Sequence, residues 1–461
     1  MTLEEILAMP EVERKIYYLK KGRKTEQPNA HALYNDWNPN KHEIVIDEEK
    51  YPKIKITTKS EERITDPSTG KEYVEPAVKK EVEPNRIALP IEQDIVNIQT
   101  AFTVGTEPVL DCQPDQSEES LLSALKQVFK KNKLKYQNKK VVRAWLAEQE
   151  VAEYWYVVKD DGFWAKLKRK VAGIFGKSRP EYRLKSAIWS PFRGDKLYPF
   201  FNDQGDLVAL SREYKKKDLD DVEITCFMTI TKDKVYQWEL TGNWADKGSF
   251  THGFKKLPVI YMYRPEAYCE KIKSLRVRLE KLLSNYADCI DYHFFPILML
   301  FGDVQNFSGE FKNRVVELTG QGANAQYLTW SQVPDTVKFE VETLLSQIYG
   351  LTNTPRISFD SLKGSGNAVS GVAFDYVFMS THLNVENLNE TVGEFMQRRV
   401  NFLVSALGSV NTTLESASET IDVDVQMQPY RLENLSEKID TAIKAKDLSL
   451  IHISEPTRLA L

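Results

Sequence analysis

The sequence predicts an α+β fold, and three patterns carry this prediction. Between residues 153 and 240, aromatic and β-branched residues alternate with polar ones and are interrupted by turn residues such as Asn202 and Gly205, which is typical of an antiparallel meander. Residues 266–291 place apolar side chains alternately four and three positions apart, and this spacing indicates a long helix. Residues 372–407 have the pattern of a second long helix.

The composition is that of an ordinary globular chain and limits the kinds of partner. The 461 residues are 42% apolar and 28% charged, which allows roughly two to four folding units. The formal net charge of −4 lacks the basic excess of a tight nucleic-acid binder. The cysteines have neither CxxC nor zinc-ligand spacing, so we expect reduced thiols at Cys112, Cys226, Cys269 and Cys289. Without a signal peptide or a membrane-spanning run, we expect a soluble protein made in the cytoplasm.

Residues 1–265 are predicted to form one α+β unit. The first 85 residues are polar, and their runs HEIVIDE and YPKIKITTK favour edge strands or extended arms rather than a core. A helix ending near Gly105 follows, and Asp115 with Glu118 forms a capping box that opens the next helix. A further helix carries Trp145. The predicted strands are EYWYVV, SAIWSPF, LYPFFN, LVALSREY, DVEITCFMTIT and KVYQWEL.

The most basic cluster that the patterns single out is KLKRK, residues 166–170. Such a cluster suits contact with a membrane or nucleic acid, and it equally suits a solvated loop or helix between strands. The sequence alone leaves both interpretations open.

The second half of the chain is predicted to be mainly helical. After the helix over residues 266–291, residues 292–333 predict a small strand–helix–strand unit of PILMLFGD, EFKNRVVEL and AQYLTW. Residues 334–350 predict a helix that stops at Gly350, and residues 351–371 a long polar loop. The helix over 372–407 follows, and residues 408–447 contain a strand over 421–430 and a helix over 433–446.

The last segment, residues 448–461, begins LSLIHISEPTR, which resembles the translation of a transposase-type sequencing-library adapter. We therefore expect residues 448–461 not to belong to the natural protein, and the natural chain to continue beyond Asp447.

Motifs of catalysis and cofactor binding do not fit this sequence. The glycines between Gly364 and Gly371 are not followed by the Lys and hydroxyl residue of a phosphate-binding loop. Neither HExxH nor GxSxG occurs, and the charge run at Asp218, Asp220 and Asp221 is typical of a solvated turn. The sequence therefore predicts no enzyme and no cofactor or metal.

The order of elements and four segments carry a resemblance to a known family. FTVGTEPV resembles the family's glycine-then-Pro-Val segment, and HGFKKLPVIYMYRPE the strand that leads into its first stem helix. KIKSLRVRLEKLLSNYADCID resembles that stem helix, and SGVAFDYVF the start of the long helix after its tunnel loop. Over residues 86–447 the chain thus resembles the portal proteins of tailed double-stranded-DNA bacteriophages, of the siphophage type.

The resemblance implies a portal-like fold in a ring of about twelve identical subunits. Residues 1–265 would be an N-terminal arm and wing, 266–291 and 334–350 the stem helices, and 292–333 a small α/β clip. Residues 351–371 would be the tunnel loop, 372–407 a long wing helix and 408–447 a wing strand and the start of a crown-proximal region, with the crown lost to truncation. The implied location is the portal vertex of the virion, after assembly in the cytoplasm of the bacterial host.

The resemblance implies a channel for the packaging and ejection of double-stranded DNA. Its implied partners are the terminase, the head–tail connector, and the major capsid and scaffold proteins, without a membrane. In the tunnel loop, Arg356 and Lys363 are the only positive side chains and Ser365, Gly366 and Asn367 form a small polar tip. We expect these five residues to contact DNA weakly and without sequence preference. A surface loop without a ligand is the alternative for this segment.

Two other functions stay open at this point. One is a structural or adaptor protein of a phage assembly, in which the same helices make only protein contacts. The other is an enzyme acting on DNA, such as a nuclease using dispersed carboxylates, for which the sequence lacks clustered metal ligands.

Overall fold

The computed structural model describes residues 1–59, 62–65, 72–75, 78–159, 182–217, 220–293, 297–307, 316–328, 334–356, 378–428 and 430. The α+β prediction is confirmed, because helices and antiparallel sheets share the chain. The chain divides into two compact units. The first unit comprises Met1–Tyr34, Glu92–Glu270 and Thr352–Leu461, and the second comprises Asn35–Ile91 and Lys271–Leu351.

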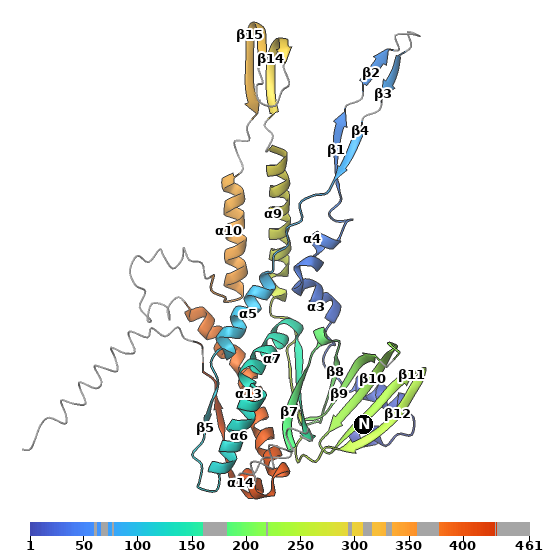
Figure 1. Cartoon of the computed structure of the whole chain (residues 1–461), viewed down its shortest axis with the longest axis vertical. Coiled ribbons are helices and arrows are strands. Elements are labelled where there is room, and N and C mark those ends of the chain that lie inside the picture. The colour runs from blue at the N-terminus through green and yellow to red at the C-terminus, as the bar shows by residue number, and fades with distance from the viewer. Residues whose placement is uncertain are drawn as a thin grey trace, which may run out of the picture. The chain divides into compact units, whose positions relative to one another are not determined.

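The predicted meander over residues 153–240 is divided between two sheets of the first unit, because its first two strands belong to a separate three-stranded sheet. Its other four strands join β12 in a five-stranded antiparallel sheet in the order β12-β11-β10-β9-β8 (Figure 1), which we call the meander. A hydrogen bond of 2.8 Å between the buried hydroxyls of Ser211 and Thr229 joins two of its inner strands, β9 and β10. The bounds are β8 Lys196–Phe201, β9 Leu207–Lys217, β10 Glu223–Thr231, β11 Lys234–Thr241 and β12 Asn243–Thr251. The sequence patterns did not single out β12, whose residues are mostly exposed and include Asp246, Lys247 and Gly248.

A second, three-stranded sheet of the first unit has the order β13-β6-β7. Its strands are β6 Glu150–Lys159, β7 Tyr182–Trp189 and β13 Val259–Tyr263. Side chains from this sheet and from the meander share a buried core that includes Ala152, Trp189 and Val259 with Leu210 and Ile230. Burial of such a contiguous apolar cluster is the main force that holds the two sheets together.

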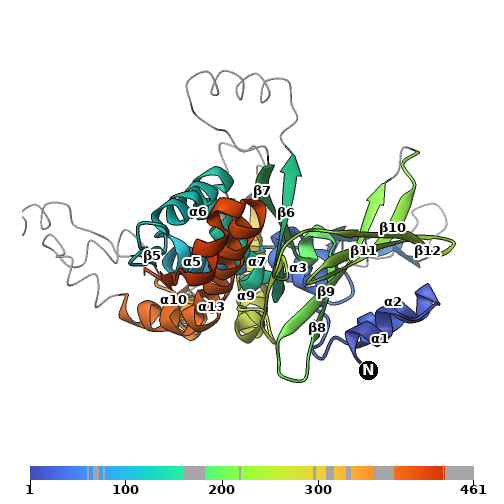
Figure 2. The same ribbon diagram turned by 90° about the horizontal axis from the view of Figure 1, so that it is seen from below.

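The amino-terminal residues form helices, so the prediction of arms without a core is wrong for them. Helix α1 covers Leu3–Leu7, with Thr2 and Glu5 forming a capping box, and α2 covers Val12–Lys21. Ile6, Ile16 and Leu19 are buried against Phe227 and Trp238 of the meander. Figure 2 shows both helices beside that sheet. The apolar residues of VERKIYYLKK lie three and four apart, which is a helical spacing that the polar composition obscured.

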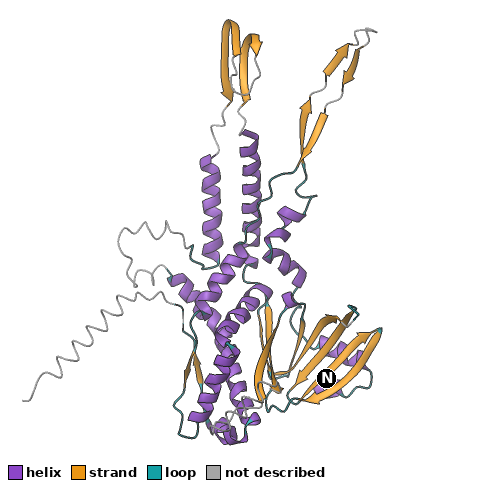
Figure 3. Cartoon of the chain, viewed as in Figure 1, coloured by secondary structure: helices purple, strands orange, loops and turns teal. Residues whose placement is uncertain are grey.

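Helices α5, α6, α7 and α14 of the first unit gather around α13 (Figure 3). The bounds are α5 Ile91–Val104, α6 Glu119–Asn132, α7 Leu134–Glu148, α13 Met379–Val410 and α14 Glu415–Thr420. The short strands β5 Val109–Asp111 and β16 Asp424–Gln426 pair beside them. The long-helix prediction is confirmed from Met379 onward, whereas residues 372–377 lie outside the described residues, as do residues 160–181 with the KLKRK cluster and residues 433–446.

The start of α6 corrects the predicted capping box. The Glu118 carboxylate accepts the Asp115 N–H at 3.0 Å, as such a box requires. Helix α6 nevertheless begins at Glu119, with Glu118 as its cap. The Glu118 carboxylate also accepts the Thr420 hydroxyl at 2.6 Å. A tertiary hydrogen bond therefore replaces part of the expected local motif.

The second unit holds two long helices, α9 Lys273–His293 and α10 Pro334–Leu351, which lie side by side in Figure 1. Helix α9 starts seven residues after the predicted start at residue 266, and α10 continues through Gly350 rather than stopping there. The hairpin β14 Ile297–Phe307 and β15 Val316–Leu328 occupies the segment between them. The predicted helix EFKNRVVEL is wrong at its end, because residues 316–318 belong to β15.

The rest of the second unit comes from residues 35–91. The segment YPKIKITTK contains the predicted strand, β1 Ile54–Lys59, which pairs with β4 Val78–Val82. Strands β2 Glu62–Thr65 and β3 Glu72–Glu75 form a second pair. The strand predicted at HEIVIDE is wrong, because Glu43–Ile46 forms helix α4 after helix α3 Ala30–Trp37. No helix among the described residues is long and apolar enough to cross a lipid bilayer.

Candidate functional site

The structure describes only the two ends of the segment that the sequence predicts to contact DNA. Arg356 is described and exposed, whereas Lys363, Ser365, Gly366 and Asn367 lie outside the described residues. On one side the description ends at Arg356, and on the other it resumes at Phe378. Both ends belong to the first unit, and a buried polar cluster holds them there. We call this cluster, formed by Gln99, Tyr268, Thr352, Asn353, Thr354, Thr381 and Asn384, the loop anchor.

Gln99 of α5 is the centre of the loop anchor and is fully buried. Its side-chain nitrogen donates to the carbonyl oxygens of Thr352 at 3.2 Å and Asn353 at 3.1 Å, and to the hydroxyl of Thr354 at 2.9 Å. Buried backbone carbonyls need such donors, because water cannot reach them. One side chain thus satisfies three successive residues at the start of the loop.

The residues after the loop complete the same cluster from α13. The Thr381 hydroxyl donates to the Asn353 carbonyl oxygen at 2.8 Å. The Asn384 side-chain nitrogen donates to the Gln99 side-chain oxygen and to the Tyr268 hydroxyl, both at 2.9 Å. The two ends of the loop are therefore bonded directly to each other and jointly to α5.

Tyr268 closes the network from the chain segment before α9. Its hydroxyl donates to the Thr352 carbonyl oxygen at 2.6 Å. Burial raises the pKa of Tyr268 to about 12, so the hydroxyl keeps its proton and remains a donor at neutral pH. The Arg264 guanidinium lies 5.2 Å from the Tyr268 ring centroid, and burial lowers the pKa of Arg264 from its ordinary value. The sequence pattern placed Tyr268 on the first stem helix, which is wrong because it precedes α9 in the first unit.

Backbone conformation and aromatic packing add to the anchoring. Asn353 has a φ of 48°, in the left-handed region that Asn adopts more readily than most residues. Phe378 packs against Phe102 of α5 with ring centroids 5.5 Å apart, and His382 contacts the same ring at 5.7 Å. Val385 is buried in this cluster. The loop therefore leaves and rejoins a packed part of the unit.

The loop anchor can fix the position of the backbone at both ends of the loop. Its side chains are amides and hydroxyls, which hold backbone groups in place, and it contains no carboxylate. Sequence reasoning missed Gln99, Tyr268 and Asn384 as site residues. The only signal was a large polar residue between the apolar positions of α5 at Ile95 and Phe102, which are also buried.

The second unit has a separate buried polar cluster on α9. Glu280 accepts from the Leu89 N–H at 2.9 Å and from Arg276 at 3.1 Å, and its carboxylate lies 2.6 Å from His42 Nδ1. Arg276 also donates to Asp36 at 2.9 Å. The sequence analysis followed the apolar residues of this helix and therefore missed the face that carries these charged residues.

Helices α9 and α10 are joined by an ion pair of Arg278 and Glu340 at 2.6 Å. Next to Glu340 in α10, the side chain of Phe339 is 71% exposed. A large apolar side chain that remains this exposed on a helix is a candidate contact for another copy of the chain.

Comparison with known proteins gives a family match. A family model described as "Phage portal protein, SPP1 Gp6-like" matches residues 53–453. A solved chain from the neck of an empty gene transfer agent particle computed with C6 symmetry is 11% identical, with a TM-score of 0.42. A chain from the virion of a native gene transfer agent particle is 10% identical, with a TM-score of 0.37. Each comparison covers 81% of this chain and 88% of the other. No curated protein matches the sequence.

Proposed function

Because the chain belongs to the SPP1 Gp6-like family of phage portal proteins, which form the portal at a capsid vertex, we propose that the loop between Thr354 and Phe378 lines a channel for double-stranded DNA. The tunnel loop predicted over residues 351–371 overlaps this segment. The observation that carries the proposal is the direct hydrogen bond between its two flanks, from Thr381 to Asn353 at 2.8 Å. This bond makes the loop start and end at one point of the first unit, so a contact between the loop and DNA would not require the packed flanks to separate.

The composition of the loop suits a sliding contact. Arg356 and Lys363 are the only positive residues in 351–371, and Asp360 is the only negative one. Each phosphate contact adds salt-dependent affinity, so a few positive charges hold DNA weakly and without regard to sequence. Ser365, Gly366 and Asn367 supply small polar groups that pass over the DNA surface. We propose these five residues as the DNA-facing set.

The same family supports a ring of about twelve copies with cyclic symmetry. In this proposal α9 and α10 are the stem helices, β14 and β15 form the clip, and the first unit is the wing. The ring stands in the virion after assembly in the host cytoplasm, and it docks the terminase, the head–tail connector, and the capsid and scaffold proteins. It works as a structural channel and not as an enzyme.

Deletion of residues 356–369 tests the loop assignment. We expect rings to form as before, seen by electron microscopy, while nuclease-protected DNA in assembled heads falls sharply because the channel has lost its lining. The double substitution Arg356→Ala/Lys363→Ala should give a weaker form of the same defect. Lys232→Ala/Lys234→Ala, on an exposed turn of the meander, is the matched control and should package normally.

Two results would contradict the proposal in different ways. Rings of the deleted chain that package and retain DNA normally would show that this loop is not the DNA contact. Particles that lack this protein and still package DNA would favour the adaptor alternative, in which the helices make only protein contacts.

A further inference from the structure

A strongly basic surface on the first unit is unused by the proposed function. Residues 120–147, which include most of α6 and α7, contain seven lysines and one arginine but no acidic residue. Six of these lysines are exposed, namely Lys126, Lys130, Lys131, Lys133, Lys135 and Lys140. Within the described part of the chain none of the six forms an ion pair, whereas Lys255 pairs with Glu415 and Lys216 with Glu239. Among the residues that the structure describes, no ion pair therefore compensates the charge of these six lysines.

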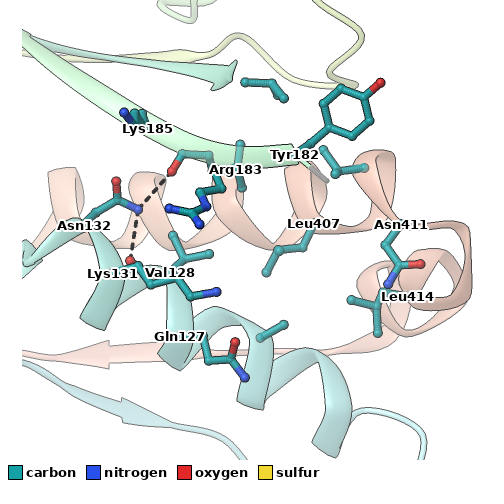
Figure 4. Close-up of a pocket in the computed structure, with 14 residues that line it drawn as sticks. Gln127, Val128, Lys131, Asn132, Tyr182, Arg183, Lys185, Leu407, Asn411 and Leu414 are labelled. Atoms are coloured by element: carbon teal, nitrogen blue, oxygen red, sulfur yellow. Dashed lines mark hydrogen bonds between the residues drawn. The ribbon is translucent and has the colours of Figure 1, made fainter. Parts of the chain in front are cut away.

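A cavity of about 250 Å³ opens in this surface between α6, β7 and the end of α13 (Figure 4). Val128 of α6 and Leu407 of α13 line it together with Leu184 and Leu414. In Figure 4, Val128 and Leu407 extend into the space between the elements. The cavity therefore offers an apolar interior that can take one or two large apolar side chains.

Positive side chains surround the apolar interior. Lys131 of α6 and both Arg183 and Lys185 of β7 line the cavity, and all three are exposed. In Figure 4, Arg183 extends from β7 toward α6. We call the cavity and these three residues the basic groove.

The walls of the basic groove are fixed relative to each other. Asn132 at the end of α6 donates to the Val128 carbonyl oxygen at 3.0 Å and to the Leu184 carbonyl oxygen of β7 at 3.1 Å. The next residue, Lys133, has a φ of 53° and turns the chain directly into α7. Because the bond from Asn132 to Leu184 joins the α6 wall to the β7 wall, this part of the cavity is preformed, which lowers the entropic cost of binding.

We propose that the basic groove binds an acidic peptide segment of a partner protein, one that inserts a large apolar side chain between α6 and α13 and places carboxylates against Lys131, Arg183 and Lys185. An apolar anchor in a preformed pocket with charged groups at its rim is the usual arrangement of a peptide-binding site. This inference does not depend on the DNA contact of the tunnel loop.

The apolar interior is what favours a peptide over DNA. The sugar–phosphate backbone can pair with lysines, but it has no aliphatic group to fill a cavity lined by leucine and valine. The chain's own segment of residues 160–181 does not complement the charge, because it holds six Lys or Arg against three Asp or Glu. A peptide with both carboxylates and an apolar side chain matches both features of the groove.

Fluorescence anisotropy with the full chain tests this inference. The probe is a fluorescein-labelled peptide of about 16 residues with leucines at i, i+4 spacing and glutamates between them. Val410, 42% exposed at the cavity, offers a substitution that is tolerated by the fold. We expect Val410→Asp and Lys131→Glu/Lys185→Glu each to weaken binding about tenfold or more. Lys232→Glu/Lys234→Glu changes the net charge equally and should leave binding within about twofold.

Two further probes separate the possible occupants. The same peptide with every leucine replaced by glutamine should bind about tenfold more weakly, because it cannot fill the cavity. A DNA duplex of about 20 base pairs should be insensitive to Val410→Asp. If the duplex or the glutamine peptide binds as tightly as the leucine peptide, or if no peptide binds, the inference is overturned. The inference is also overturned if Val410→Asp abolishes assembly of the ring, because the groove would then be occupied by a second copy of the chain and not by a peptide.

Discussion

At the scale of single residues, Gln99 decides whether the loop has a fixed base. Gln99→Met keeps the length of the side chain but leaves the Thr352 and Asn353 carbonyl oxygens without their Gln99 donor. We expect a loss of about 2–4 kcal/mol in the free energy of unfolding, measured with urea, since the substitution removes four hydrogen bonds that contribute about 0.5–1.5 kcal/mol each. Limited proteolysis between Thr354 and Phe378 should also become faster.

Gln347→Met is the control for Gln99→Met, because Gln347 is exposed on α10 and its replacement should change stability by less than about 0.5 kcal/mol. Equal stability of the two variants would contradict the role assigned to Gln99 in the loop anchor.

Glu148 predicts a dependence of stability on pH. It is buried at the end of α7 and accepts the Phe192 N–H at 2.7 Å, and burial raises its pKa to about 7. The folded state thus binds this proton more tightly than the unfolded state, whose carboxyl has its ordinary pKa near 4.5. The stabilising effect is complete below about pH 4.5 and is lost as the pH rises to about 7.

Glu148→Gln isolates this effect, because the amide stays neutral at every pH. We expect variant and wild type to be similarly stable near pH 4.5, and the variant to be more stable by a few kcal/mol near pH 8.5. Urea unfolding across this range measures the difference. A constant difference between the two proteins at all pH values would show that Glu148 has an ordinary pKa.

At the scale of elements, one buried ion pair connects α13 to the sheet beneath it. Arg399 of α13 donates to Glu153 of β6 at 2.6 Å and to the Asn138 side chain of α7 at 2.5 Å, and all three residues are buried. Arg399→Met leaves the Glu153 carboxylate buried without a counter-charge, so we expect a loss of about 3–5 kcal/mol in unfolding free energy.

The neighbouring Arg398 provides the matched control, since it pairs with Glu394 on the exposed side of the same helix. Arg398→Met should cost less than about 0.5 kcal/mol. Adding Glu153→Gln to Arg399→Met should restore much of the lost stability, because the buried charge is then removed. An equally unstable double variant would mean that packing, and not charge, explains the effect of Arg399→Met.

Elements with a strong local pattern could be predicted from the sequence. Helix α10 and the strands β8 to β11 of the meander were recognised because their periodicity arises from burying one face of each element. HEIVIDE failed for the opposite reason, since alternation over so few residues fits a strand and a short helix equally well. Ile44 is buried in α4. His42, the residue before this helix, is bonded to Glu280, which is 238 residues away in the sequence. No local pattern contains that contact.

The candidate site could be located from the sequence only in part. The long polar segment with its glycines marked the loop, and Arg356 is indeed exposed at its start. The loop anchor could not be predicted, because Gln99, Tyr268 and Asn384 are more than 100 residues apart in sequence and meet only after folding. The basic groove was missed because its positive residues come from a helix and a strand about 50 residues apart, whereas the KLKRK cluster is continuous in the sequence.

At the scale of the whole molecule, the proposed ring predicts a role for the exposed face of α10. Phe339→Glu places a charge where we expect a neighbouring copy to pack. We expect analytical ultracentrifugation to show fewer assembled rings. The free energy of unfolding of the monomer in urea should change by less than about 0.5 kcal/mol, because the Phe339 side chain is 71% exposed.

Tyr17→Glu, at a 58% exposed position of α2, is the control for Phe339→Glu and should leave ring formation unchanged. Normal rings from Phe339→Glu would remove α10 from the subunit interface and require another surface to take its place.

The bond between Thr381 and Asn353 has a consequence for how this protein can change through evolution. Because the two flanks are held together, inserted or deleted residues between them do not pull on α5 or α13. Doubling the length of such an excursion costs only about 0.6 kcal/mol in closure entropy. If this loop lines the channel as proposed, small insertions and deletions in it would widen or narrow the bore of the ring, while the surrounding architecture keeps its sequence.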